Sequence, residues 1–455
     1  ILPQTLSVLQ TRSTPIGVEL VVGNHEEFNF SSEYFGAILQ YPGKFGQVYD
    51  YADFIAKAAK NEIKVAVAAD ILSLAKLTPP GEMGAAVVLG TTQRFGIPLG
   101  YGGPHAAYFA TREEYKRSMP GRIIGVTIDT NGNRALRMAL QTREQHIKRD
   151  KATSNICTAQ VLLSVMAGMY AVYHGPKGLQ YIANKVHASA VTLANELAKL
   201  GIQQTNTAFF DTIVVTADAK KIKAIAEKNE VNFYYIDGNS VSISLNETTS
   251  IADLNKIVAI FASANDKQAT TIESLSETNH FPESINRTST FLQHDVFNKY
   301  HSETALMRYV KMLERKDLAL NHSMISLGSC TMKYNPKIDE EVASFKGFTN
   351  IHPLQDTKTV QGALEAISLA NDYLCEITGM DKMTFQPAAG AHGEFSGLLL
   401  IKAYHKSRND EKRHKIIVTD SAHGTNPASA SMVNYDVISV PSSSDGCVDI
   451  EALKA

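Results

Sequence analysis

The chain has 455 residues, with 44 lysines and arginines against 46 aspartates and glutamates and a formal net charge of -2. At about 100–200 residues per domain, this length predicts about two to four domains rather than a single module. A hydrophobic fraction of 44% and a nearly balanced charge argue against a disordered chain, a nucleic-acid-coating protein and a polybasic membrane anchor.

The first third of the sequence alternates short apolar runs with an amphipathic segment. Residues 18–22, 37–40, 65–69 and 85–89 are expected to be buried strands, and residues 51–60 have apolar side chains at helical spacing. Asn61 follows as the expected helix end. This alternation predicts a βαβ arrangement and an α/β fold class.

The middle of the chain changes to a helical period. Residues 154–200 contain a long apolar run and then a surface helix that ends before Gly201. The most apolar part, residues 161–173, is shorter than the ~20 residues that a membrane-spanning helix needs, so a buried helix is expected. An α+β segment follows, with strands at 212–216, 232–236 and 240–245 and helices at 219–228 and 251–264.

Residues 265–300 show no consistent period and are rich in Thr, Ser, Asn and Glu, which predicts a linker. After it we expect a helix at 301–316, a loop-rich stretch at 318–353, a helix at 361–378 and α/β structure at 382–455. The chain has no initiator Met and ends where a helix is expected to begin. It therefore has the features of a piece of a longer polypeptide.

The four cysteines, Cys157, Cys330, Cys375 and Cys447, are scattered without a CxxC pair. Neither a zinc site nor a disulfide framework is indicated, and reduced thiols in a reducing compartment are expected. The sequence around Cys330 supplies no base that would make it a nucleophile.

The strongest local motif is QPAAGAHGE at residues 386–394, which precedes an apolar helical run. Small residues and glycines at a helix start leave backbone N–H groups free to bind an anion, which the helix dipole also favours. The Lys-Ser/Thr pair of a nucleotide P-loop is missing, so a different phosphate is indicated. The alternative is a glycine-rich turn that only lets the helix pack closely.

A short strand at residues 415–419 comes next and is followed by DSAHGTNPASA. Ligands of open α/β sheets lie at the carboxyl ends of strands, so His423 is expected to project into the crevice that the turn at Ala389, Gly390 and Ala391 faces. An imidazole there can lie on an aromatic cofactor ring or act as an acid or base. A hydrogen-bonded surface histidine is the alternative.

Three further segments stand out. Residues 327–336 (LGSCTMKYNP) and 350–354 (NIHPL) are polar and low in regular structure, as binding loops often are. Residues 96–104 (GIPLGYGGP) are either a bent turn or a close approach of the backbone to a ligand. Residues 141–157 include Arg143, Lys148, Arg149 and Lys151, which are interpreted as a solvated face.

Eight ordered blocks closely resemble the glycine decarboxylase (P-protein) family of the glycine cleavage system. They are KFGQVYDYADF, PPGEMGAAVVLG, GYGGPHAAYFATREEYKRSMPGRIIG, LQTREQHIKRDKATSNIC, LGSCTMKYNP, NIHPL, QPAAGAHGE and SAHGTNPASAS. The resemblance extends from about residue 15 over nearly the whole chain. Residues 15–265 look more like the fused form of this family, and residues 301–455 look closer to the second subunit of its split form.

The resemblance implies the pyridoxal-phosphate (PLP) fold of the aspartate-aminotransferase type, fold type I, built as two homologous units. Residues 1–165 would be the later part of a first large domain and residues 166–265 a small α+β domain. Residues 266–300 would be a linker and residues 301–455 an arm and the early part of the second, PLP-binding domain. The sequence shows no obvious internal repeat. The resemblance accounts for this, because the two pieces would cover complementary portions of the shared fold.

The same resemblance implies the site and the reaction. Ala389, Gly390 and Ala391 would bind the phosphate of pyridoxal 5'-phosphate, with His423 stacked on its ring, and Ser329, Cys330, Thr331 and His352 would line the substrate pocket. Glycine would be decarboxylated and its aminomethyl group passed to the lipoyl arm of the H-protein. The implied assembly is a homodimer or pseudo-dimer without nucleic acid or membrane, in the bacterial cytoplasm, with the mitochondrial matrix as the alternative.

One departure from the family pattern concerns the lysine that anchors the cofactor as an imine. The block that contains it in the second unit is absent, and in the first unit Gln93, or Arg94 after a one-residue shift, stands in its place. Neither side chain forms such an imine. The first unit is therefore expected to be catalytically silent, and these 455 residues alone are expected to be inactive.

Two other functions remain as hypotheses. The first is a non-catalytic scaffold or partner unit, which would follow if the natural chain ended at Ala455. The second is another fold-type-I enzyme, such as a cysteine desulfurase or an amino-acid decarboxylase. That enzyme would need a lysine-bearing strand within the chain and a different substrate loop.

Overall fold

The computed structural model describes residues 1–455 except 141, 153–156, 158, 277–278, 317–335 and 411. The chain divides into two compact bodies. The first body comprises residues 1–2, 25–110 and 161–363, and the second comprises residues 3–24, 111–160 and 364–455.

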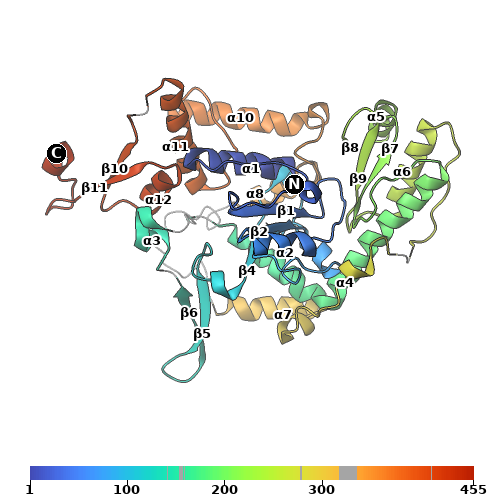
Figure 1. Ribbon diagram of the computed structural model, residues 1–455, viewed down its shortest axis with the longest axis horizontal. Coiled ribbons are helices and arrows are strands. Elements are labelled where there is room, and N and C mark those ends of the chain that lie inside the picture. The colour runs from blue at the N-terminus through green and yellow to red at the C-terminus, as the bar shows by residue number, and fades with distance from the viewer. Residues whose placement is uncertain (141, 153–156, 158, 277–278, 317–335, 411) are drawn as a thin grey trace. The chain divides into compact units, whose positions relative to one another are not determined.

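The first body is built on a four-stranded sheet in the order β1-β2-β3-β4 (Figure 1). Its strands are β1 (Gly36–Tyr41), β2 (Lys64–Ala69), β3 (Val87–Thr91) and β4 (Ala107–Thr111). The pairs β1/β2 and β2/β3 are parallel, as the βαβ pattern predicts. Helix α2 (Ala52–Lys60) connects β1 to β2, buries Phe54, Ile55 and Ala58, and ends at Asn61.

Two sequence predictions in this region differ from the structure. Residues 18–22 form neither a helix nor a strand, and Val21 and Val22 are exposed. The predicted strand at 85–89 lies two residues further on, because β2 pairs with Val87, Val88 and Leu89. Both differences arise because strand bounds depend on hydrogen-bonding partners from elsewhere in the chain.

Helix α4 (Val161–Lys199) has a break at Gly175, whose φ of 61° and ψ of -176° are not helical, and Pro176 starts the next turn. A Cβ at Gly175 would lie 2.5 Å from the Phe297 carbonyl oxygen, so only glycine fits there. After the break Ala183, Val186, Leu193 and Leu197 are buried. Before it Val161 is 65% exposed, and Leu162, Val165 and Met166 are exposed as well. The prediction of a buried helix at 161–173 is therefore wrong for residues 161–166.

A smaller α+β layer of the first body follows α4. Strands β7 (Thr212–Thr216), β9 (Ser240–Ser244) and β8 (Tyr234–Tyr235) pair antiparallel in that order, with helices α5 (Ala219–Lys228) and α6 (Ile251–Ala264). Its core includes Leu197, Ile213, Ile222, Leu254 and Phe261. Ser250 and Asp253 form a reciprocal capping box at the start of α6, which explains why this helix begins where its sequence predicts.

The predicted linker contains two short 3-10 turns, η7 (Glu283–Ile285) and η8 (Asp295–Asn298). The described part of this segment nevertheless packs on the first body. Ile272 and Ile285 are buried, and the Arg287 guanidinium donates to the Leu74 carbonyl. The prediction of domain boundaries at residues 165, 265 and 300 stays a prediction.

The end of the first body is helical. Helix α7 (Glu303–Glu314) lies within the predicted 301–316 helix. Residues 318–353 are expected to be loop-rich, but their described part contains α8 (Lys337–Ala343) and α9 (Lys346–Thr349). The reason is local: Pro336 precedes α8 and Asp339 and Glu340 lie in its first turn, which favours a helix start.

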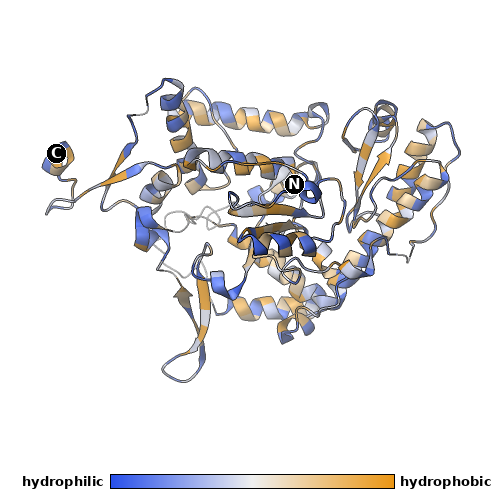
Figure 2. Cartoon of the chain, viewed as in Figure 1, coloured by the Kyte–Doolittle hydropathy of each residue, from blue (hydrophilic) through white to orange (hydrophobic). Residues whose placement is uncertain are grey.

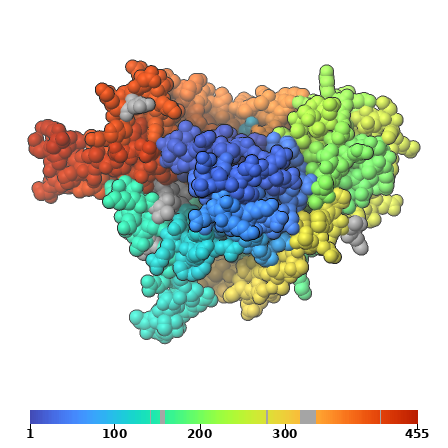
Figure 3. Space-filling model, in the orientation of Figure 1, coloured from blue at the N-terminus to red at the C-terminus, as the bar shows by residue number. Residues whose placement is uncertain are grey.

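The second body contains a parallel βαβ unit, β10 (Lys415–Thr419), α12 (Thr425–Met432) and β11 (Asp436–Val440), as shown in Figure 1. It also contains α1 (Pro3–Ser13), most of α10 (Gln361–Thr378), α11 (Gly390–Ser407) and α13 (Ile450–Lys454). Its small core is Phe395, Ala430, Val433 and Tyr435. The dark blue N-terminal segment lies against the orange-red residues in Figure 3. From this segment, the Arg12 guanidinium lies over the Phe395 ring, 4.6 Å from its centroid.

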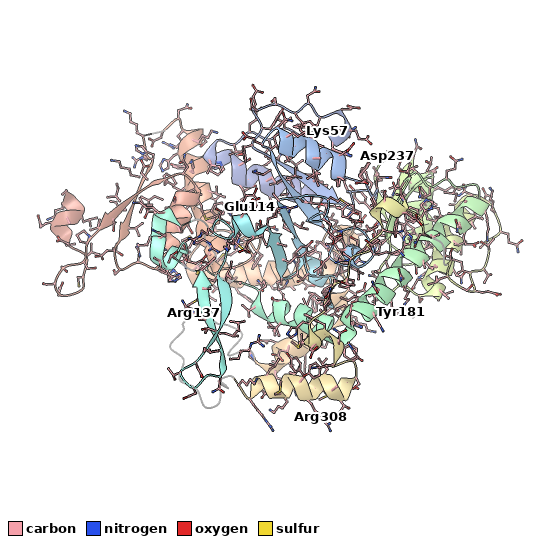
Figure 4. All side chains as sticks on the ribbon, turned by 60° about the horizontal axis from the view of Figure 1, so that its bottom comes forward. Lys57, Glu114, Arg137, Tyr181, Asp237 and Arg308 are labelled. Atoms are coloured by element: carbon pink, nitrogen blue, oxygen red, sulfur yellow. The ribbon has the colours of Figure 1, made fainter. Side chains whose placement is uncertain are left out.

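Strands β5 (Ile123–Ile128) and β6 (Arg134–Leu140) form a hairpin of the second body, on which Figure 4 labels Arg137. Ile124, Val126, Ile128 and Leu136 are exposed on it, and Figure 2 shows these strands as hydrophobic. Among the described helices, none is long and apolar enough to cross a bilayer.

Candidate functional site

The turn at residues 389–391 begins helix α11, as the motif predicts. Ala389 is the N-cap, with extended backbone (φ -165°, ψ 171°) and no side-chain capping bond. Its carbonyl accepts from the N–H groups of His392 and Gly393. The N–H groups of Gly390 and Ala391 belong to the first turn of α11, where a helix supplies no carbonyl partner of its own. A Cβ at Gly390 would meet no atom of the described residues within 4 Å, apart from its own helix backbone and chain neighbours, so the position that a side chain would take is open.

His423 lies in the short loop between β10 and α12, after the carboxyl end of a parallel strand. Its side chain is exposed. The Thr425 N–H donates to Nδ1 of the ring at 3.2 Å, and the Asn426 N–H donates to the His423 carbonyl. Because Nδ1 accepts a hydrogen bond, the proton of the neutral ring is on Nε2, which is the nitrogen left for a ligand.

Helices α11 and α12 pack together, which relates the two loops. The Ser429 hydroxyl donates to the Glu394 carboxylate at 3.4 Å, and Phe395 and Ala430 share the core of the second body. The Asp420 carboxylate, at the start of the His423 loop, accepts from the Ser442 hydroxyl and N–H. These bonds lower the pKa of Asp420, so it remains charged and holds the loop after β11 in place.

Arg149, from the segment predicted to be a solvated face, contacts the loop of His423. Arg149 Nη1 donates to the Ala422 carbonyl at 2.9 Å and Nη2 to the Thr419 carbonyl at 3.2 Å. Gln160 Nε2 donates to the Ala388 carbonyl at 3.3 Å. The expectation of a solvated face is therefore wrong for Arg149, and no local sequence signal reveals a partner some 270 residues away.

Gln93 and Arg94 follow β3 in the first body, where they have structural partners. Gln93 Nε2 donates to the Pro98 carbonyl at 3.1 Å. Arg94 Nη1 lies 2.6 Å from the Asp211 carboxylate and 3.5 Å from that of Asp70. Burial lowers the pKa of Arg94, but the attraction of these two carboxylates outweighs burial and raises the pKa above its ordinary value. Arg94 is therefore a permanent cation between two acidic side chains.

The residues expected around the substrate are only partly described. Ser329, Cys330 and Thr331 lie outside the described residues. His352 lies in the first body, where its Nδ1 accepts from the Leu354 N–H and burial lowers its pKa. Ala389, Gly390, Ala391 and His423 lie in the second body. Cys157, Cys375 and Cys447 are free thiols.

A concave site of the first body, of about 310 Å³, has an apolar lining. Phe95, Tyr170, Tyr173 and His174 contribute to it, with Phe95 and Tyr170 stacked at 5.4 Å between ring centroids. It contains none of the residues predicted for the cofactor. Among the described residues, no group of three or more His, Cys, Asp or Glu side chains is placed to hold a metal ion.

Comparison with known proteins gives one consistent family. The family model described as "Glycine cleavage system P-protein" matches residues 1–261. The glycine dehydrogenase (decarboxylating) of Flavobacterium johnsoniae is 67% identical over 454 residues, which is 100% of this chain and 48% of that protein. The mitochondrial glycine dehydrogenase (decarboxylating) of Pisum sativum is 49% identical over 455 residues, 99% of this chain and 43% of that protein. The chain thus spans about half the length of these relatives.

A solved structure supports the fold. The crystal structure of a glycine decarboxylase (P-protein) of the glycine cleavage system, in inhibitor-bound form, aligns with a TM-score of 0.53 at 29% identity. The alignment covers 58% of this chain and 63% of that chain. The predicted α/β fold of type I is confirmed.

Proposed function

The chain belongs to the glycine cleavage system P-protein family, and on that premise we propose that it is part of a PLP-dependent glycine decarboxylase. The substrate would be glycine, and the aminomethyl group would pass to the lipoyl arm of H-protein. The names of the relatives support this reaction. The structural observation that supports it best is the pair of loops at Gly390 and His423. Their helices pack together, Arg149 bonds to the His423 loop and Gln160 bonds to the residue before the Gly390 turn.

The start of α11 suits a phosphate group. Helix α11 has 18 residues, and its N-cap Ala389 has no side chain that could occupy the first N–H groups. Those donors and the helix dipole attract an anion. We assign the cofactor phosphate to the N–H groups of Gly390 and Ala391, with Ala389 shaping the turn. When bound, PLP supplies an electron sink for decarboxylation.

His423 suits the face of an aromatic ring. It is exposed at the strand end, and the Thr425 N–H bond fixes its tautomer. We assign the imidazole to stacking on the cofactor ring, with Nε2–H as the available donor. Ser329, Cys330, Thr331 and His352 remain our proposed substrate-pocket residues, by their resemblance to the family motifs alone.

The anchoring lysine is proposed to lie outside these 455 residues. Gln93 and Arg94 cannot form the imine, and both are held by the first body's own groups. These contacts support a first unit that has a structural role and no catalytic one. The scaffold hypothesis assigns the same role to that unit. We retain the division at residues 165, 265 and 300 and a homodimeric or pseudo-dimeric assembly as proposals. Relatives occur in bacteria and in mitochondria, and we propose the bacterial cytoplasm.

Glycine–bicarbonate exchange tests the proposal. The full-length natural protein, supplied with PLP and lipoylated H-protein, is expected to exchange labelled bicarbonate into glycine. A polypeptide of these 455 residues is expected to show no exchange, because it lacks the lysine. Exchange by the shorter polypeptide would contradict the lysine argument, and no exchange by the full-length protein would contradict the proposed reaction.

A further inference from the structure

The loop that presents His423 is held by a guanidinium fork from a distant segment. Arg149 donates to the carbonyl of Thr419, the last residue of β10, and to that of Ala422, the residue before His423. The two hydrogen bonds thus hold the loop where it leaves β10, at Thr419, and at Ala422, directly before His423. Because a guanidinium is planar and its donors are fixed relative to one another, two such bonds define the position of both carbonyls.

The residue after His423 is restrained by the same segment. An added Cβ at Gly424 would lie 2.3 Å from both the backbone and the side-chain oxygen of Gln145. Gly424 and Gln145 are both buried. The backbone on each side of His423 is therefore packed against residues 145–149, while the imidazole itself remains exposed.

The supporting segment itself has an unusual backbone. Arg149 has φ 54° and ψ -117°, in a region that glycine adopts readily and other residues rarely do. The two hydrogen bonds of its side chain and the packing of Gln145 on Gly424 offset this strain. An arginine in a strained conformation that contacts two loop carbonyls is more than a solvated surface residue.

A second residue of the same body, Gln160, contacts the other loop. Gln160 donates to the carbonyl of Ala388, the residue before the N-cap of α11. Arg149 therefore bonds to the His423 loop and Gln160 to the anion-binding turn. A shift of the His423 loop would break the bonds of Arg149, and a shift of the turn would break the bond of Gln160.

We propose that Arg149 is a positioning residue of the cofactor site, which holds the His423 ring at the correct place relative to the phosphate turn. The inference rests on the proposed function and extends it to a residue that does not touch the cofactor. Gln145 and Gln160 support the same arrangement through Gly424 and Ala388.

The test uses the full-length natural protein and a titration with PLP, followed by absorbance. Arg149→Ala is expected to weaken PLP binding about tenfold, the effect of losing hydrogen bonds from a charged donor. Arg149→Lys keeps the charge but not the fork, so it should restore only part of the affinity. If Arg149→Ala does not fold, the PLP affinity of Arg149→Lys provides the test, and an affinity equal to that of the natural protein would contradict the role of the fork.

Arg143 provides a matched control. It makes the same kind of fork in the same body, from Nε to the Met119 carbonyl at 2.8 Å and from Nη2 to the Gly121 carbonyl at 2.7 Å. Those carbonyls lie shortly before β5 and far from the His423 loop in sequence, and neither belongs to the residues that Arg149 bonds. Arg143→Ala is expected to leave PLP affinity unchanged. An equal loss in both variants would overturn the inference.

A double-mutant cycle separates this inference from the proposed function. If Arg149 acts through His423, adding Arg149→Ala to His423→Ala should cause little further loss, whereas additive losses would overturn the positioning role. If His423→Ala alone leaves PLP affinity unchanged, the proposed site itself fails. If His423→Ala weakens binding but Arg149→Ala does not, only the inference about Arg149 fails.

Discussion

Arg94 and Asp211 form an ion pair of 2.6 Å within the first body, between the loop after β3 and the start of β7. Asp70, at the carboxyl end of β2, lies on the same guanidinium nitrogen at 3.5 Å. Burial raises the pKa of Asp70, the charge of Arg94 opposes that rise, and the nearby Asp211 adds to it. One cation thus compensates two carboxylates that would otherwise repel each other.

Arg94→Ala is expected to destabilise the protein by about 3 kcal/mol, because it leaves two partly buried carboxylates without their cation. Arg94 is 23% exposed and Asp211 12% exposed, so solvent screens this pair only in part. Urea unfolding of the purified protein measures the effect. Asp266→Ala is the control. Asp266 pairs with Lys221, but its carboxylate is 87% exposed, so this ion pair should contribute less than about 1 kcal/mol to the free energy of unfolding. Equal effects would contradict the argument.

Stability is expected to fall between about pH 6.5 and pH 4 because of His187. This side chain is buried, its Nδ1 donates to the Phe210 carbonyl at 2.8 Å, and its Nε2 accepts from the His280 N–H. Burial lowers its pKa from 6.5 to about 4. Above pH 6.5 the ring is neutral in both states. Below it only the unfolded chain takes up the proton, which costs the fold about 3 kcal/mol by pH 4.

The comparison that isolates this effect is His187→Gln, measured by urea unfolding at several values of pH. The variant should be less stable at pH 7 and should lose the part of the pH dependence that lies between pH 4 and pH 6.5. Carboxylates with lowered pKa values, such as Asp253 and Glu196, affect both proteins alike at lower pH. Parallel curves for the two proteins would show that His187 does not titrate as described.

Gly390→Pro is expected to weaken PLP binding by about tenfold in the full-length protein. Proline is well tolerated at the first position of a helix, and Ala389 already has the extended backbone that precedes proline. The substitution therefore removes one N–H donor while keeping the helix start. Gly390→Ala retains the donor, and among the described residues its Cβ meets no neighbour outside its own helix within 4 Å. Equal losses in the two variants would contradict the role of the N–H group.

Gly424→Ala is expected to displace the His423 loop, because the new methyl group would overlap the Gln145 oxygens at 2.3 Å. PLP affinity should fall by about tenfold, with a lower melting temperature. Gly397→Ala within α11 is the control, since a Cβ there meets nothing within 4 Å and alanine favours a helix. Unchanged affinity in Gly424→Ala would show that the loop adapts without cost.

Elements with strong local signals were predicted from the sequence with accurate bounds. Helices α5, α6 and α10 and strands β7 and β10 have the predicted limits, because capping residues, hydrophobic period and flanking turns lie within each segment. The start of α11 near Gly390 follows from its small residues in the same way. The family was also determined at this level, since its blocks are contiguous stretches of sequence.

Only the tertiary structure decided which of these segments contact one another. The contact of Arg149 with Thr419 and Ala422, and the pairing of Arg94 with Asp70 and Asp211, join residues that are far apart in the chain. The exposure of Val161 and the absence of a strand at residues 18–22 depend equally on what lies beside them. Local propensity acts over a few residues, whereas burial and pairing depend on distant parts of the chain, so the sequence pattern alone could not determine them.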